Sequence, residues 1–274
     1  MKSLSKWLPA ALIPFFRNLK RRQLRHDGNK FAVYYTNWLG KRTINGQTEF
    51  TCRSTTADHS TFDQVFGQQE YNIHHLVRGK EIVGWYHQLG ADPLIIDCGA
   101  NIGASPALFA TLFPNATILA VEPDKDNYEL LVKNARNFHA VNPLLAAVAG
   151  FDGWALITNA GDGANMRRTK IVDDKAAETV KALSLSTLLS KQAGIPFILK
   201  VDIEGAELDF FAANTDALSR FPIILVELHD WLYPGKATSR AFLEWHAGKN
   251  RDFIIRGETI ISISNDFNPQ APPP

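Results

Sequence analysis

Short apolar runs alternate with amphipathic stretches from residue 93 onward. The runs PLIIDCG (93–99) and ATILAVEP (116–123) are nearly continuous in apolar residues, and each precedes a stretch with helical spacing. Strands that are apolar along their whole length are typical of a sheet covered on both faces. Their regular alternation with helices indicates parallel pairing. The pattern therefore predicts an α/β fold with a mostly parallel sheet and helices on both faces.

The same alternation continues toward the C-terminus. Further strands are predicted at 142–150, 197–205 and 221–230, helices at 105–113, 125–138, 184–194 and 206–214, and a closing hairpin at 252–265. A Gly-rich loop is predicted near 150–170. Before residue 93, the alternating stretches 31–40 and 47–54 predict a small hairpin or two short strands, and 61–88 is predicted to be mostly helical.

These patterns divide the chain into four segments. They are a basic amphipathic N-terminal segment (1–30), a segment of strands and helices covering the predicted ligand site (31–90), the main α/β domain (91–266) and a disordered proline-rich tail (267–274). A chain of this size and apolar content can bury one large core with a small appendage.

Charge is unevenly distributed along the chain. The net charge is +1, so no overall field favours nucleic acid, and none is expected as a partner. Residues 1–26, however, hold seven basic side chains and no acid, which leaves 22 basic and 28 acidic side chains for the rest. The apolar run 7–16 is too short to span a bilayer, and a basic cluster rather than a small-residue cleavage site follows it.

The N-terminal segment has two interpretations. It is either an interfacial helix in peripheral contact with anionic membrane, or a helix packed on the protein with its basic face in water. The two cysteines, Cys52 and Cys98, form no disulfide framework and suit a reducing compartment, so a cytoplasmic location is expected. The oligomeric state stays open.

Acidic residues gather at the ends of the predicted strands. They are accompanied by one histidine, and the set is Asp97, Glu122, Asp202, Glu204, Glu227 and His229. In open parallel sheets, ligands bind beyond the carboxyl ends of the strands. A concentration of acids at that edge favours a ligand that carries positive charge or many hydroxyls.

The turn after the first main strand discriminates between two cofactors. The stretch DCGANIGA places Gly99, Asn101 and Ala104 at the positions of a dinucleotide-binding fingerprint, but Asn101 replaces the glycine that lets a pyrophosphate approach. Asp97 would also repel a pyrophosphate and suits an ammonium group. Glu122, 25 residues further on, is placed to accept both hydroxyls of a ribose. The pattern therefore favours S-adenosylmethionine over a nicotinamide dinucleotide.

The motifs IIDCGANIGAS, ILAVEPDKDNYELLVKN, ILKVDIEGAE and ILVELHD resemble those of the FkbM-type methyltransferase family. The resemblance covers about residues 50–230, and KVDIEGAE is its most specific element. It implies a Rossmann-like class I methyltransferase fold with a small N-terminal extension, and S-adenosylmethionine-dependent O-methyl transfer. By motif, the cofactor would be lined by Asp97, Gly99, Asn101, Gly103 and Glu122, with Asp202 beside them. Arg53, Asp58, Glu70 and Tyr71, in a similar upstream segment, would close over its amino-acid end.

Two residues compete for the role of general base. Lys200, Asp202 and Glu204 alternate with apolar residues, so they are predicted to share one face of a strand and to form a charged network. That network is either catalytic or a brace for the sheet. His229, at the end of the next strand, is the proposed base because imidazole ordinarily titrates near neutrality. Asp202 is the alternative.

Asp202, Glu204, His229 and Asp230 could converge on a metal ion, but no metal site is predicted, because the chain shows no compact ligand spacing. The aromatic residues Trp154, Trp231, Tyr233 and Trp245 follow predicted strands, and they would either stack on a sugar ring or pack in the core. The sequence thus predicts an O-methyltransferase that acts on a hydroxyl of a sugar, glycan or secondary metabolite. The alternatives are a noncatalytic S-adenosylmethionine-binding or membrane-peripheral scaffold and, more remotely, a nicotinamide-dependent reductase.

Overall fold

The computed structural model describes residues 22–23, 33–36, 42–44, 48–53, 56–89, 93–159, 167–172, 176, 178–204 and 206–269. The chain divides into two compact units, residues 1–69 and 70–274. Apart from two residues of a short strand, the predicted basic segment 1–30 lies outside the described residues, as does most of the predicted tail. In the described part, no helix is long and apolar enough to cross a membrane.

The smaller unit holds a four-stranded sheet followed by helical turns. The strands pair in chain order, all antiparallel: β1 (Arg22–Gln23), β2 (Val33–Thr36), β3 (Arg42–Ile44) and β4 (Thr48–Phe50). Helix α2 (Thr56–Phe62) continues directly into the π-helical turn η2 (Asp63–Gln68). Phe50, Phe62 and Phe66 pack together, with ring centroids 4.8 to 6.3 Å apart. The predicted strands at 31–40 and 47–54 are thus present within this small sheet, and a third strand lies between them.

The larger unit is built on a seven-stranded sheet. Its strand order is β14-β15-β13-β12-β5-β6-β7. The bounds are β5 (Pro93–Cys98), β6 (Thr117–Glu122), β7 (Val141–Leu145), β12 (Ile195–Val201), β13 (Ile223–Glu227), β14 (Arg251–Arg256) and β15 (Thr259–Ser264). Pairing is parallel from β13 to β7, and the β14–β15 hairpin adds antiparallel to β13. The prediction of a mostly parallel sheet with a closing edge hairpin is confirmed.

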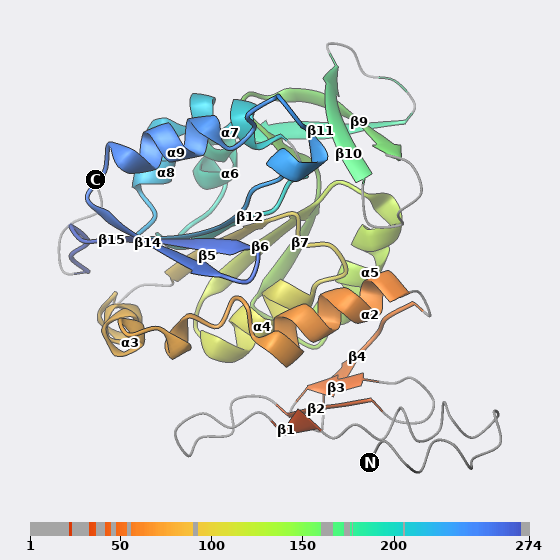
Figure 1. Cartoon of the computed structure of the whole chain (residues 1–274). Coiled ribbons are helices and arrows are strands. Elements are labelled where there is room, and N and C mark those ends of the chain that lie inside the picture. Colours follow the sequence, from red (N-terminus) through yellow and green to blue (C-terminus); the bar gives the residue numbers. More distant parts are fainter. Residues whose placement is uncertain are drawn as a thin grey trace, which may run out of the picture. The chain divides into compact units, whose positions relative to one another are not determined.

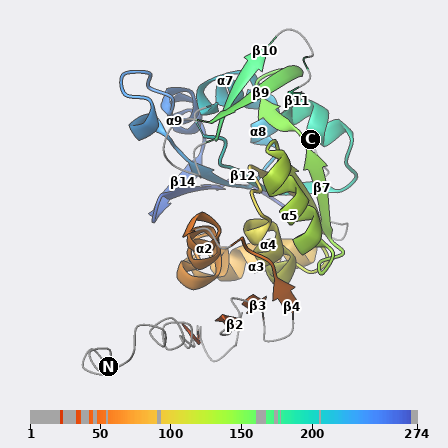
Figure 2. The same cartoon turned by 90° about the vertical axis from the view of Figure 1, so that its right-hand side faces the viewer.

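Helices cover both faces of this sheet, as the apolar strands predict. Figure 1 shows α6 (Leu185–Ser190), α7 (Glu207–Ala213), α8 (Thr215–Ser219) and α9 (Arg240–Ala247) on one face, and α3 (Gly79–Gln88), α4 (Ala104–Leu112) and α5 (Lys125–Ala135) on the other. The quarter-turn view in Figure 2 shows the same two layers. All six residues of β5 are buried. Phe210, Phe211 and Phe242 join the core from one helical layer.

A second sheet corrects the prediction for residues 142–170. The predicted strand at 142–150 divides into β7 and β8 (Ala147–Ala149), which belong to different sheets. The predicted loop contains β9 (Gly153–Asn159) and β10 (Arg167–Val172), which pair antiparallel; β11 (Thr179–Ser184) joins β9 to β8. Pro143 lies in β7, at the edge of the main sheet, where a residue without an N–H is tolerated.

The strand register brings charged residues side by side. Lys200 of β12 lies opposite Asp97 of β5, and Leu225 of β13 lies on its other side. Both β5 and β12 then end within two residues, so the segments that follow them leave the sheet at the same edge. This is the carboxyl edge, where the predicted ligand residues converge.

Candidate active site

The turn after β5 depends on three residues in the left-handed backbone region. Gly99 and Gly103 have φ values of +86° and +92°, and Asn101 has +49°. A Cβ on Gly99 would come within 1.9 Å of the Asp202 carbonyl oxygen, which no side chain can tolerate. Asparagine visits this region more readily than most residues. The turn therefore runs tightly against the loop after β12 and begins α4 immediately afterwards.

Glu122 closes the neighbouring strand and faces this turn. Its carboxylate accepts hydrogen bonds from the backbone N–H of Asn101 (2.8 Å) and of Asp124 (3.0 Å). Burial raises the pKa of Glu122 to about 7, although the Asn101 N–H opposes that rise. A carboxylate has about four acceptor positions, so Glu122 can receive further donors from a ligand.

Lys200 is the centre of a buried charged network. Its Nζ lies 3.2 Å from Asp97 Oδ1 and 3.3 Å from Asp202 Oδ2, and it donates to the Gly99 carbonyl at 3.1 Å. Ser105 donates to the second oxygen of Asp97 at 2.5 Å. Burial alone would lower the pKa of Lys200, but Asp97 and Asp202 outweigh it and raise that pKa. Burial raises the pKa of Asp97, with Lys200 opposing the rise. The network predicted around Lys200 and Asp202 is confirmed.

A second charged group is built on His229, which follows β13. Its Nδ1 lies 2.6 Å from Oε1 of Glu207, the first residue of α7, while its Nε2 lies 3.6 Å from Asp202 Oδ1. Glu207 is fully buried. A carboxylate can only accept at this separation, so Nδ1 carries the proton and Nε2 is directed away from Glu207.

The ionisation of His229 differs from the expectation of a near-neutral group. Burial would lower its pKa, but the hydrogen bond and charge of Glu207, followed by the charge of Asp202, raise the pKa to about 9. The ordinary pKa of imidazole, on which the choice of His229 rests, takes no account of a buried carboxylate behind the ring.

Tyr71 and Glu70 contact different parts of the larger unit. The Tyr71 hydroxyl donates to the Glu227 carboxylate, and the Lys200 ammonium lies 5.4 Å from the centre of the Tyr71 ring. Glu70 Oε1 accepts from the backbone N–H groups of Glu258 and Thr259 at 2.7 and 3.0 Å. Tyr71 thus lies against the charged network, whereas Glu70 ties the chain to the β14–β15 turn.

Two predicted residues lie in the smaller unit, where they pair with each other. Arg53 contacts both carboxylate oxygens of the buried Asp58, with Nη2 to Oδ1 at 2.8 Å, and its backbone N–H donates to Oδ2 at 2.6 Å. This bidentate pair orders the segment that leads into α2. A role for either residue in closing over a cofactor stays a prediction.

Glu204 lies differently from the predicted shared strand face. Because β12 ends at Val201, Asp202 and Glu204 belong to the following loop, and Glu204 adopts a left-handed φ of +48°. The Tyr233 hydroxyl donates to its carbonyl at 2.8 Å. Alternation along a strand therefore does not extend to this residue.

Three groups at this edge lie close enough to share one cation. Single ligand atoms of Asp202, Glu227 and His229 lie within 4.8 Å of one another. The ammonium of Lys200 already lies 3.3 Å from Asp202. We assign no metal to this cluster.

Comparison with known proteins places this site in a family. The model of the methyltransferase FkbM domain matches residues 97–255, which contain the glycine turn, Glu122, the Lys200 network and His229. The chain belongs to the FkbM methyltransferase family. Hexuronic acid methyltransferase AglP of Haloferax volcanii is 30% identical over 172 residues, covering 60% of this chain and 70% of the relative.

Solved structures show weaker similarity to this FkbM chain. Methyltransferase FkbM from Methylobacillus flagellatus KT has a TM-score of 0.44 at 15% identity, with 63% of this chain and 43% of that chain covered. Precorrin-6y C5,15-methyltransferase from Geobacter metallireducens GS-15 has a TM-score of 0.36 at 12% identity, with 69% and 88% covered. Both TM-scores are low, so the family assignment depends on the sequence match.

Sequence reasoning missed Glu207 in the FkbM domain, although a signal for it exists. An acid at the start of a helix is ordinarily a favourable partner of the helix dipole, which hides any other role. Glu207 shares its helix face with the buried Phe210 and Phe211, at spacings of three and four residues. An acid on an apolar helix face needs a buried partner, and here that partner is His229.

Trp231 follows the histidine and is largely exposed. It lies in the short 3₁₀ helix η4 (Asp230–Leu232), with its ring centroid 6.4 Å from that of His229. With 67% of its surface accessible, it does not serve as core packing. Trp245, by contrast, is buried among the core residues, as one of the two predicted alternatives has it. Stacking of Trp231 on a sugar ring stays a prediction.

Proposed function

We propose that this FkbM-family chain is an S-adenosylmethionine-dependent O-methyltransferase whose acceptor is a hydroxyl of a sugar-containing molecule. The observation that carries the proposal is the joint position of the glycine turn, Glu122 and the His229–Glu207 pair at one edge of the sheet. Family membership supplies the reaction class, methyl transfer. The side chains support the finer assignment of cofactor, base and acceptor.

The donor set fits a cationic ribonucleoside. Glu122 has acceptor capacity for ribose hydroxyls, and the turn at Gly99 and Gly103 exposes backbone rather than side chains. Asp97, Asp202 and Glu207 outnumber Lys200 and the protonated His229 at this edge, so the edge retains negative charge. S-adenosylmethionine, when bound, supplies a methyl group activated by a sulfonium. A dinucleotide would place a pyrophosphate beside the same acids, which is unfavourable.

His229 is suited to accept the proton of an alcohol. The neutral imidazole keeps its proton on Nδ1, bonded to Glu207, and presents the lone pair of Nε2 on the side of Asp202. After proton transfer, the imidazolium lies between two carboxylates that stabilise it. A positioned base of this kind contributes about 10²- to 10⁴-fold to rate.

A sugar is the favoured acceptor for two reasons. Trp231 offers an exposed ring beside the base, and flat aromatic surfaces are suited to the apolar face of a pyranose. The relative from Haloferax volcanii carries the name of a hexuronic acid methyltransferase. The acids around His229 favour an uncharged sugar over a uronate in this chain, because Asp202 and Glu207 would repel the carboxylate of a uronate.

The test is methyl transfer from isotopically labelled S-adenosylmethionine to a panel of neutral and acidic glycans, followed by mass spectrometry. We expect S-adenosylhomocysteine and a methyl ether on a neutral sugar, with His229→Ala retaining cofactor affinity but losing turnover. Calorimetric binding of the cofactor without product on any acceptor would favour a noncatalytic binding protein. Binding of a nicotinamide dinucleotide in its place would overturn the proposal.

A further inference from the structure

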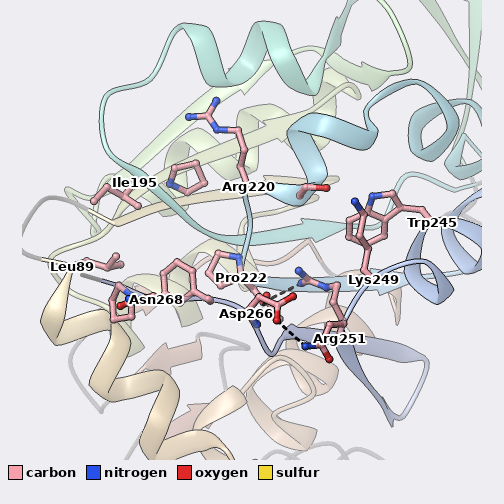
Figure 3. Close-up of a pocket in the computed structure, with 15 residues that line it drawn as sticks. Leu89, Ile195, Arg220, Pro222, Trp245, Lys249, Arg251, Asp266 and Asn268 are labelled. Atoms are coloured by element: carbon pink, nitrogen blue, oxygen red, sulfur yellow. Dashed lines mark hydrogen bonds between the residues drawn. The ribbon is translucent and has the colours of Figure 1, made fainter. Parts of the chain in front are cut away.

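A cavity lies at the edge of the main sheet opposite the candidate active site. Its volume is about 420 Å³, and its walls include Ile195 and Pro196 at the start of β12 and Pro222 just before β13. The active-site residues follow the other ends of these strands. Seven residues of β12 separate the two edges, which at about 3.3 Å per residue corresponds to about 20 Å. Figure 3 shows the residues that line this cavity.

Basic side chains predominate around the cavity. Arg220 follows α8, and Lys249 and Arg251 follow α9; the acid among the lining residues is Asp266. Its carboxylate accepts a hydrogen bond from Asn250 at 2.7 Å rather than pairing with one of the three cations. In the part of the chain that the structure describes, no ion pair balances Arg220, Lys249 or Arg251. The lining therefore carries an excess of two positive charges.

Arg251 is held in place by neutral groups. Its guanidinium donates to the carbonyls of Phe221 and Pro222, both at 3.0 Å, and to the Ser262 hydroxyl at 2.7 Å. Burial lowers its pKa to about 10, since no carboxylate compensates the charge. A partly buried guanidinium that is hydrogen-bonded but not neutralised leaves a positive field in the cavity.

Two of the three cations lie where they stabilise helix C-termini, but this role does not neutralise their charge and does not extend to Arg251. Arg220 and Lys249 come directly after the C-terminal ends of α8 and α9, where positive charge is favourable. Each such interaction involves a fraction of a charge at a helix end, so it does not neutralise two full charges. Arg251, on β14, satisfies no helix terminus of its own.

Seven of the other residues that line the cavity are apolar. Leu89, Trp245 and Phe267 line it together with several prolines, and the Arg251 guanidinium lies 5.4 Å from the centre of the Trp245 ring. A volume of this size is within the range of small-molecule sites, which are mostly apolar with a few placed polar groups. Figure 3 shows Trp245 beside Lys249 and Arg251, and Arg220 on the side of Ile195, so charged and apolar groups alternate around the cavity. Such a lining matches a ligand with a strongly anionic group and an organic body.

We propose that this cavity is a second binding site, for a small molecule that carries a phosphate. Lys249 and Arg251 attract the phosphate, Arg220 adds to the positive field of the cavity, and the organic part lies against the apolar residues. Two negative charges on one compact group match the excess better than a single carboxylate does. The site is independent of the methyl-transfer assignment, because it shares no residue with the carboxyl edge.

The experiment is isothermal titration of the full chain with phenyl phosphate and with inorganic phosphate at constant ionic strength. We expect both to bind, phenyl phosphate more tightly because its ring contacts the apolar residues. Arg220→Ala/Lys249→Ala should raise both dissociation constants at least about tenfold, because charge-assisted contacts to phosphate are lost. The matched control, Lys80→Ala/Lys133→Ala, removes two exposed charges outside the cavity and should change them less than about twofold.

Saturating S-adenosylmethionine provides a further control. It should leave both dissociation constants unchanged, because the cavity lies at the other edge of the sheet. Absence of binding, equal affinity of the double variant and the wild type, or displacement by S-adenosylmethionine would each overturn the proposal. Displacement of the anion by S-adenosylmethionine would place the anion at the cofactor site. Equal affinity for phenyl phosphate and inorganic phosphate would show that the apolar residues do not contribute to binding.

Discussion

Replacing Glu207 by glutamine is the sharpest test of the His229–Glu207 pair. The change keeps the size of the side chain but removes the charge behind the imidazole, which lies 2.6 Å away. The rise of the His229 pKa from its ordinary 6.5 to about 9 corresponds to about 3 kcal/mol in favour of the imidazolium, at about 1.4 kcal/mol per pKa unit. At pH 7.5 only about 3% of His229 is then neutral and able to act as a base.

Two consequences of Glu207→Gln act in opposite directions. The His229 pKa should fall toward its ordinary value, so the acidic limb, along which kcat/KM falls as the pH is lowered, moves from about pH 9 toward pH 7. A larger neutral fraction alone would raise the rate near neutrality. We expect a loss of about 10²- to 10⁴-fold on the plateau instead, because the amide can donate to Nδ1 and place the proton on Nε2.

The assay is kcat/KM against pH for wild type and variant, with cofactor affinity measured by calorimetry. Asp209→Asn is the matched control, since it removes one carboxylate from an exposed position of the same helix. It should leave both the limb and the plateau in place. A purely structural role for Glu207 would lower the plateau without moving the limb, and that result would refute the positioning role.

Four further expectations follow from the structure. Glu122→Gln should weaken S-adenosylmethionine binding by about 1 to 3 kcal/mol. Because ribose hydroxyls favour the carboxylate and its pKa is about 7 without ligand, wild-type affinity should fall as the pH drops below 7 and the variant should lose this dependence in pH-resolved calorimetry. Asp97→Ala should lower the free energy of unfolding, measured in urea, by about 3 to 5 kcal/mol, because it removes the fully buried acid that pairs with the buried Lys200. Recovery of stability in the double variant with Lys200→Met would support this reasoning. An unchanged midpoint of urea unfolding in Asp97→Ala would contradict it. Chelation of metal ions with EDTA should leave turnover unchanged. A loss of turnover that a divalent ion restores would identify Asp202, Glu227 and His229 as a metal site. Deleting residues 1–26 should preserve cofactor binding and reduce salt-sensitive sedimentation with anionic vesicles; equal sedimentation would favour a packed helix.

The sequence predicted the main sheet well because its strands are buried on both faces. Apolar runs of that kind leave few alternatives, and the acids at their ends indicate the ligand edge without any contact being known. The second sheet escaped prediction because β8 has only three residues and directly follows β7, so the two read as one strand. Long-range contacts decide whether an apolar stretch forms one strand or divides into two strands that belong to different sheets.

The sequence indicated which side chains gather at the carboxyl edge of the sheet, but not how they contact one another. Asp97 was expected to meet a ligand ammonium, yet its oxygens contact Lys200 and Ser105 within the protein. That arrangement depends on the register between β5 and β12, which places Lys200 opposite Asp97. Local sequence spacing cannot predict the register of two strands that lie so far apart in the chain. The raised pKa of His229 has the same origin, because Glu207 approaches it from a different helix.

The contact between Gly99 and Asp202 bears on how such a chain can diverge. Because there is no room for even a methyl group at Gly99, the turn proposed to hold the cofactor packs directly against the loop beside the proposed base. A change that shifts one displaces the other, so neither can be retuned separately. We therefore expect new acceptor preferences to arise elsewhere, in segments such as η4, where Trp231 is exposed. Natural variation in substrate should accordingly concentrate around Trp231, while the buried contact stays fixed.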